Sequence, residues 1–370
     1  MSHELQLRRP RWHELTGKQK AFVVATLTAA FIAGILLAFS SIQQGLFKKE
    51  AFPGIKPSMG AWVSSFNNDA IFIGYLVMYA VLVVPLVTLI TRWTQGREAQ
   101  FQWAKPPNWR QVRWPFIGRT TFGISEWFCG GWAFALQLDA NPSIGGNPGL
   151  ISALVLLAPA YIGGYTLVKG WREIRLNGRI SRISVVVLSL SGIFVSSADS
   201  SSAGGNTISW SVGLALAAGI FGALKVGAMR TLKARGLSLS LEVLMYAAIS
   251  IVVFTGLVVV GVHWFGFQPP ALSTILHNEH LRWAVVTASA SKALAEFANR
   301  SHGDPHQITT VQLVNVPASL VISLFMVPGY HPTRLSIVAM VLILAASSLA
   351  VWLLPSSGQG QATAVKRSTA

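Results

Sequence analysis

Charged side chains are scarce in this sequence. Only 11% of its 370 residues are charged, whereas about 25% are charged in ordinary soluble domains. Hydrophobic residues make up 52% of the chain, so a soluble domain of this length would lack the polar surface it needs. The composition therefore argues against a soluble globular fold and predicts that most of the chain faces lipid.

Cysteine and the common catalytic motifs are also nearly or wholly missing. The single Cys129 lies in an apolar segment, so neither a disulfide framework nor a cysteine-based metal site is expected. The sequence has no H-E-x-x-H, G-x-S-x-G or paired-aspartate motif, and its histidines have no ligand-like spacing. We therefore expect no metal, no cofactor and no catalytic residue, and the chain is predicted not to be an enzyme.

Long hydrophobic runs dominate what is present. Reading for runs of about 20 apolar residues predicts an all-α polytopic membrane protein with ten transmembrane helices. The predicted spans cover roughly residues 21–44, 69–91, 115–138, 149–168, 183–198, 210–229, 241–264, 282–300, 308–328 and 335–354. Residues 45–68 are expected to form a loop, because their Pro and Gly residues argue against a continuous helix.

The basic residues are distributed unevenly between the two sides of these spans. A net charge of +16 would suggest nucleic-acid binding in a soluble protein. With ten spans, 21 of the 29 Lys and Arg residues fall on the side of both termini, five on the opposite side and three within spans. Because basic loops stay in the cytoplasm, the bias predicts cytoplasmic termini, contacts with membrane lipid and no nucleic-acid partner. A bacterial cytoplasmic membrane is the expected location.

The two halves of the chain show a weak internal similarity. In each, an x-Pro dipeptide precedes an apolar helix with a central proline, Pro159 or Pro317, and a turn and a terminal helix follow. Since each half holds five spans, the second is inserted upside down, as in the inverted repeats of secondary transporters. The predicted units are a cytoplasmic N-tail 1–20, a first five-helix repeat 21–198, a connector 199–209, a second five-helix repeat 210–354 and a disordered cytoplasmic C-tail 355–370.

Several segments carry a resemblance to a known family. The fourth span reads SALVLLAPAYIGGYTL, the turn GWREIRLNGRIS follows it, and the fifth span ends in LSGIFVSS. The sixth, WSVGLALAAGIFGALKVGAMRTLKARG, runs from a helix of small residues into a basic turn. With these segments, residues 115–355 resemble the drug/metabolite transporter (DMT) superfamily, in particular its EamA-type ten-helix members.

The resemblance implies a basket of ten helices around a central cavity that opens to each side of the membrane in turn. Members of the family move amino acids, nucleotide sugars, sugar phosphates, amines or drugs by proton coupling, antiport or facilitated diffusion. They carry out no covalent chemistry.

Charged residues inside the spans are the first candidates for a binding site. Placing a charge at a helix centre costs about 2.5–3.5 kcal/mol on insertion scales, so such residues persist where they face a cavity or a partner. Lys292 and Glu296 are four residues apart on the eighth span and are able to form an ion pair. Either both line the translocation path, with Glu296 releasing Lys292 to an anionic substrate group, or the pair only locks the helix to its neighbours.

Glu126 lies near the middle of the third span. Arg119 is two turns away, too far for easy pairing, so Glu126 is expected to be the less well paired acid. A desolvated carboxyl group takes up a proton more readily, which makes Glu126 the candidate proton-coupling residue. Trp127 beside it is a candidate for binding a cationic or aromatic substrate. The alternative is that Glu126 pairs with Lys225 or Arg119 and only ties the bundle together.

Other polar residues of the spans receive more modest predictions. Gln312 and Asn315 lie close to Pro317 in the ninth span and are candidates for substrate binding. Lys225 is expected to reach the membrane interface from the cytoplasmic end of its helix. Glu242 is expected to be solvated or to cap a helix end.

These features together predict a secondary transporter that moves a small polar or amphipathic metabolite or drug by alternating access, through proton coupling or exchange. A flippase for a lipid-linked headgroup would have the same fold and is the first alternative. A polytopic membrane transferase is the second, although it would need clustered His, Asp or Cys residues at a membrane face. The expected partners are a small-molecule substrate and membrane lipid. Formation of a homodimer is left as an open alternative.

Overall fold

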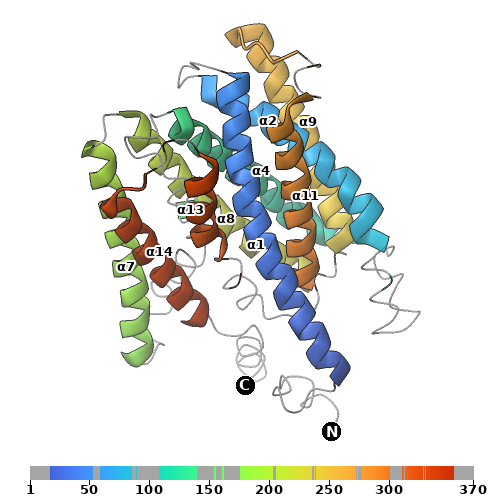
Figure 1. Cartoon of the computed structure of the whole chain (residues 1–370). Coiled ribbons are helices and arrows are strands. Elements are labelled where there is room, and N and C mark those ends of the chain that lie inside the picture. The colour runs from blue at the N-terminus through green and yellow to red at the C-terminus, as the bar shows by residue number, and fades with distance from the viewer. Residues whose placement is uncertain are drawn as a thin grey trace.

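A computed structural model of the chain describes a bundle of helices (Figure 1). It describes residues 17–52, 59–85, 89, 108–139, 154–155, 161, 176–202, 206–235, 237, 239–271, 273, 277–300, 311, 313–327, 329 and 331–353. The helices are α1 (Gly17–Ala51), α2 (Gly60–Met78), the π-helical η3 (Tyr79–Val83), α4 (Trp109–Asp139), α7 (Leu176–Ser202), α8 (Asn206–Ala234), α9 (Leu239–Phe265), α11 (Glu279–Arg300), α13 (Asn315–Met326) and α14 (Arg334–Leu353). Within these residues there is no strand, so the predicted all-α class is confirmed.

Three helices in the described part of the chain are long and apolar enough to cross a membrane. They are Val23–Ala51 of α1, Trp210–Met229 of α8 and Leu241–Phe265 of α9. Large apolar side chains also lie exposed on the outside of the bundle, among them Phe194 and Phe325. Soluble proteins rarely expose apolar surface on this scale, and lipid would cover it. These features indicate a membrane protein.

The predicted spans coincide with described helices except for the fourth, 149–168, which lies mostly outside the described residues. The ninth differs in detail, because the helix described there begins at Asn315. Pro317 therefore lies in the first turn of α13 rather than at its centre. A proline fits the first turn because the N–H groups there have no helical acceptor to lose.

The predicted loop at residues 45–68 is wrong at both ends. α1 continues through Ala51 and α2 begins at Gly60. Phe47 is completely buried and packs against Phe52 and Phe66, so tertiary burial favours helix where local composition suggested a loop. The predicted connector 199–209 is likewise helical up to Ser202 and again from Asn206.

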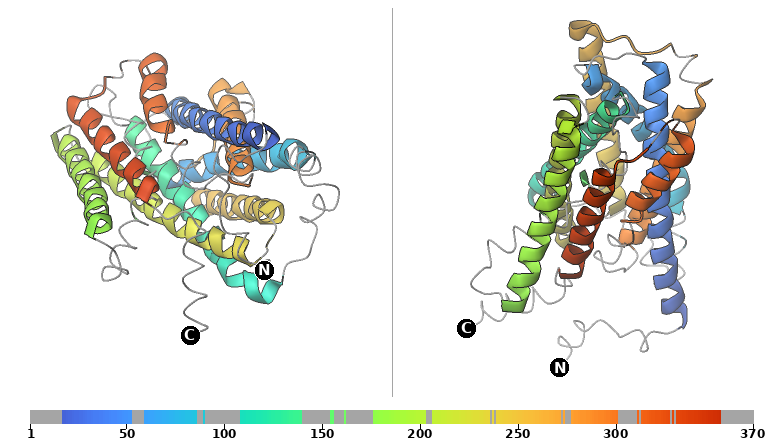
Figure 2. Two further views of the ribbon diagram at one scale, coloured as in Figure 1. Left: turned by 90° about the horizontal axis from the view of Figure 1, so that it is seen from below. Right: turned by 60° about the vertical axis from the view of Figure 1, so that its left-hand side comes forward.

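The helices pack in four extensive pairs, which are α4 with α8, α1 with α11, α7 with α14, and α2 with α9. Viewed from below, α7 and α14 lie side by side at one edge of the bundle (Figure 2). In Figure 1, the beginning of α1 and the end of α14 both lie at the lower end of the bundle. The first and last described helices thus start and finish on the same side.

Two apolar clusters are the largest in the described core. One joins α4, α7, α8, α13 and α14 around Val185, Ala215 and Ile343. The other joins α2, η3 and α9 through aromatic rings, with Phe72 stacked on Phe254 at 5.8 Å between ring centroids. α4 contributes to both, because Phe134 packs against the first cluster and Trp127 against the second.

A glycine decides how closely α7 and α14 approach each other. A Cβ atom at Gly192 would lie 2.6 Å from Ile343 Cγ1 and 3.3 Å from the carbonyl oxygen of Ala339.

We predict that Gly192→Ala destabilises the protein by about 1–3 kcal/mol through overpacking, seen as a lower thermal-unfolding midpoint in detergent. Gly213→Ala is the control, because its added Cβ meets nothing within 4 Å and improves helix propensity by up to about 1 kcal/mol. An equal effect of both substitutions would contradict close packing of α7 on α14.

Candidate functional site

A cavity of about 240 Å³ lies inside the helix bundle. Side chains of α1, α2, α4, α8, α11 and α13 line it. Its charged lining residues are Glu126, Lys225 and Lys292, and its neutral polar ones are Ser41, Gln44, Asn68, Ser291 and Asn315. Trp127 and Phe134 add aromatic walls from α4. The volume suits a ligand smaller than a typical drug, for which pockets of about 300–1,000 Å³ are usual.

Small residues leave room for the cavity where the helices cross. α1 contributes Ala33 and Gly34, α4 contributes Gly130 and Gly131, and α11 contributes Ala288. Hydrogen bonds to backbone carbonyls hold these helices around the space. Ser291 donates to the carbonyl of Ala33 at 2.7 Å, and Asn68 donates to the carbonyl of Trp127 at 3.1 Å.

Four of the six residues predicted to bind substrate meet in this cavity. Glu126 and Trp127 reach it from α4, Lys292 from α11 and Asn315 from α13. The side chain of Glu296 and all of Gln312 lie outside the described residues. Glu126 and Asn315, almost 200 residues apart in sequence, therefore line the same cavity.

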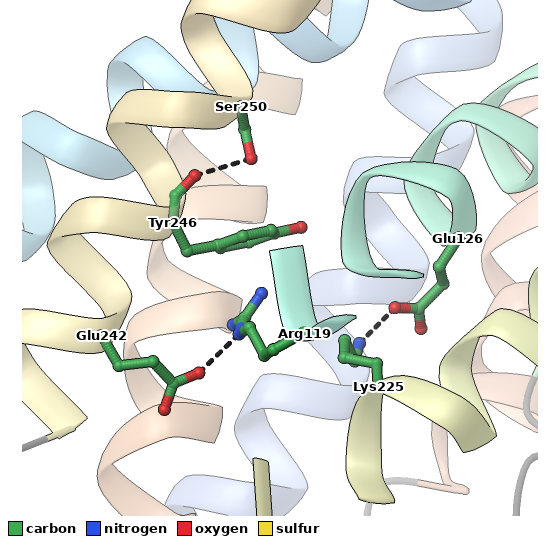
Figure 3. A network of polar contacts seen from close by, with 6 residues as sticks. All are labelled: Arg119, Glu126, Lys225, Glu242, Tyr246 and Ser250. Atoms are coloured by element: carbon green, nitrogen blue, oxygen red, sulfur yellow. Dashed lines mark hydrogen bonds and ion pairs between the residues drawn. The ribbon is translucent and has the colours of Figure 1, made fainter. Parts of the chain in front are cut away.

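Glu126 forms an ion pair with Lys225, which joins α4 to α8 (Figure 3). The expectation that Glu126 is the less well paired acid is therefore wrong, and the pairing named as its alternative is present. The expectation that Lys225 extends to the membrane interface is wrong too, because close packing of α8 on α4 turns this side chain into the bundle. The two side chains are 19% and 13% exposed, so the pair is open to a ligand in the cavity.

A second ion pair is buried more deeply. Arg119 Nε lies 2.5 Å from Glu242 Oε1, and the two side chains are 1% and 3% exposed. The guanidinium of Arg119 also stacks over the ring of Tyr246, with 3.5 Å from its Cζ to the ring centroid (Figure 3). The prediction that Glu242 is solvated is wrong, because this side chain is buried and Arg119 of α4 compensates its charge inside the bundle.

The approach of α4 to α9 at this second pair depends on Gly123. A Cβ atom there would lie 2.9 Å from the Tyr246 ring and 3.0 Å from Arg119 Nη1. Glu242, Tyr246 and Ser250 follow one another at four-residue intervals on α9, so all three share one helix face. This four-residue spacing of polar residues in an apolar run is a signal in the sequence from which the burial of Glu242 could have been predicted.

Amide side chains that sequence reasoning missed connect α1, α2 and α11. Asn67 Nδ2 donates to Gln44 Oε1 at 2.7 Å, Gln44 Nε2 donates to Ser40 Oγ at 3.1 Å, and Ser40 Oγ donates to the carbonyl of Ala284 at 2.9 Å. Asn67 and Asn68 lie in the segment predicted as a loop and Gln44 is the last residue of the predicted span before it, so they were not considered. Their position among otherwise apolar residues was the available signal.

The cavity offers one acid, two ammonium groups, several amides and hydroxyls, and aromatic walls, which are groups that bind a small polar or amphipathic molecule. Among the residues that the structure describes, no group of three or more His, Cys, Asp or Glu side chains is placed to hold a metal ion. The sequence matches no model of a known protein family and has no significant match among curated proteins.

The buried Arg119–Glu242 pair predicts a large asymmetry between single and double substitutions. Arg119→Met leaves a carboxylate buried without its partner and is expected to cost about 3–5 kcal/mol of stability, whereas the double variant with Glu242→Leu regains most of the loss. Thermal unfolding of the purified protein in detergent measures both. Arg334→Met, which removes an exposed arginine at the start of α14, is the control and should unfold like the wild type. A single Arg119→Met variant as stable as the control would rule out this role.

Proposed function

We propose that the protein is a secondary transporter of the drug/metabolite transporter type, which moves a small polar or amphipathic molecule through the cavity by alternating access. The observation that carries the proposal is the cavity itself, which holds Glu126, Lys225 and Lys292 inside a bundle of apolar helices. Ionisable residues in such surroundings are costly and mark substrate or ion pathways.

The helix pairs support an arrangement of two inverted five-helix repeats. In the proposed arrangement, α1, α2, α4, the span at 149–168 and α7 correspond in order to α8, α9, α11, α13 and α14. A two-fold axis that exchanges the repeats converts the α1–α11 pair into the α8–α4 pair. The same axis maps the α2–α9 and α7–α14 pairs onto themselves. These are the four most extensive pairs in the bundle, as expected for such a pseudo-two-fold axis in the membrane plane.

Basic residues at one end of the bundle support cytoplasmic termini. Arg235, after α8, donates a hydrogen bond to the carbonyl of Gln111 at the start of α4, so these two basic helix ends adjoin. Arg110 and Arg113 lie in the same first turns of α4. The positive-inside rule assigns this end to the cytoplasm and the end with Lys49 and Arg282 to the opposite side.

Both ion pairs of Figure 3 connect the proposed first repeat with the second, since α4 pairs with α8 and with α9. Alternating access moves one repeat against the other, so these contacts would change during transport. A proton on Glu126 would remove the charge that holds Lys225, and a charged substrate would compete for either partner. Substrate or proton binding at this pair would thereby bias the position of the repeats.

Flux in reconstituted proteoliposomes tests the proposal. We expect an imposed pH gradient to drive uptake of at least one compound from a panel of amino acids, amines, phosphorylated sugars and small carboxylates. Glu126→Gln should lose at least tenfold of gradient-driven uptake and retain exchange of the same compound between the two sides, because an amide does not take up and release a proton during the cycle. Glu279→Gln, which neutralises an exposed acid at the start of α11, is the matched control.

Wild-type protein that moves none of these compounds, in either uptake or exchange, would contradict a role in transport of such metabolites. Scrambling of fluorescent lipids by the same vesicles would favour the flippase instead. Glu126→Gln with unchanged gradient-driven uptake would leave the Glu126–Lys225 pair as a structural tie between α4 and α8.

The proposed orientation predicts which cysteines an impermeant maleimide reaches in intact cells. Cys129 is the sole cysteine, so Cys129→Ser provides a background without thiols. Lys49→Cys, at the exposed end of α1, should be labelled in intact cells, and Arg235→Cys should be labelled only after permeabilisation. The reverse pattern, or labelling of both sites in intact cells, would refute the orientation.

A further inference from the structure

Lys48 is a buried lysine that the proposed transport cycle does not use. It lies in the last turn of α1 and its side chain is 5% exposed. Its Nζ donates one hydrogen bond, to the carbonyl of Gly131 at 3.1 Å. Among the described side chains, no carboxylate lies within ion-pair distance of Lys48, in contrast to Lys225, which has Glu126.

Lys48 adjoins the wall of the cavity. Gln44, one helical turn earlier on α1, lines the cavity, and so does Gly131, the residue whose carbonyl accepts the hydrogen bond from Lys48. Glycine at this position of α4 lets α2 approach closely beside the carbonyl that holds Lys48. A Cβ atom at Gly131 would lie 2.4 Å from Ser64 Oγ, so α1, α2 and α4 come together at this point.

The surroundings of Lys48 leave its charge without compensation. An ammonium group has three N–H donors, and only one of them has an acceptor in the described structure. A buried charge without a counter-ion is unfavourable unless another group supplies the opposite charge. The nearest space for such a group is the adjacent cavity, which Gln44 and Gly131 line.

We propose that Lys48 is the anion-binding residue of the cavity and that the substrate is a small amphipathic organic anion. Its acidic group, whether carboxylate, phosphate or sulfonate, accepts hydrogen bonds from Lys48, while its apolar part lies against Trp127 and Phe134. The proposal names the substrate class of the proposed transport site, but the binding it describes does not require transport.

Binding to the purified full-length protein in detergent tests this assignment. The probes are phenylacetate, its neutral analogue phenylacetamide and the cation phenethylamine, at equal millimolar concentration and equal ionic strength. A compound that binds the folded state raises the thermal-unfolding midpoint by mass action. We expect phenylacetate to raise the midpoint of the wild type by several degrees and the other two probes to leave it nearly unchanged.

Substitutions then assign the preference to Lys48. Lys48→Gln is expected to abolish the shift with phenylacetate, and Lys48→Arg is expected to retain part of it because the positive charge is kept. Lys49→Gln removes the exposed lysine next to it and should respond like the wild type. This neighbour has the same charge and nearly the same place in sequence, so it controls for a general effect of net charge.

Three results would each overturn the proposal. They are a wild type that phenylacetate stabilises no more than phenylacetamide does, a Lys48→Gln variant that keeps the preference, and a Lys49→Gln variant that loses it equally. The first comparison uses only wild-type protein, so it decides even if Lys48→Gln fails to fold. Selective binding of phenylacetate without flux in proteoliposomes would reject transport while keeping Lys48 as an anion site. Flux of cations alone would reject the anion site while keeping transport.

Discussion

The cost of burying charge in an apolar bundle is the constraint on which the rest of this structure depends. α4 carries an arginine and a glutamate two turns apart, and each has its counter-ion on a different helix. Arg119 requires Glu242 of α9, and Glu126 requires Lys225 of α8. Leaving a buried partner alone costs about 3–5 kcal/mol, so the two pairs contribute strongly to how α4 lies between α8 and α9.

The cavity follows from this placement of α4. Its aromatic residues divide between two apolar clusters, with Trp127 packed against one and Phe134 against the other. Small residues of α1, α4 and α11 face the space between the clusters, which leaves a volume of about 240 Å³ that polar groups line. The Glu126–Lys225 pair is less buried than the Arg119–Glu242 pair because it lies at this cavity. One pair therefore serves mainly to hold the helices together, whereas the other is accessible to a ligand.

Local composition was sufficient to predict where most helices lie, but it did not predict correctly where some of them begin and end. Apolar runs of about 20 residues predict helices reliably because hydrophobicity is a property of each segment alone. The end of α1 differs, because Phe47 and Lys48 are buried by residues of other helices. Four of the predicted site residues line the cavity, because polar groups in apolar segments tend to face the interior of the bundle. Lys48 and Asn68 were missed because the predicted loop excluded them from that argument, and Gln44 was missed at the last position of a predicted span.

The sequence by itself determined the helical class, the membrane character indicated by the long apolar helices, and the presence of Glu126, Trp127, Lys292 and Asn315 among the inward-facing residues. Only the tertiary structure decided which charges meet. Arg119 and Glu242 are 123 residues apart, and Glu126 and Lys225 are 99 residues apart. Hydrophobic periodicity reports which face of a helix is buried, but it contains no information on the partner helix. That choice depends on side-chain size at the crossing points and on compensation of charge, which exist only once the helices are packed.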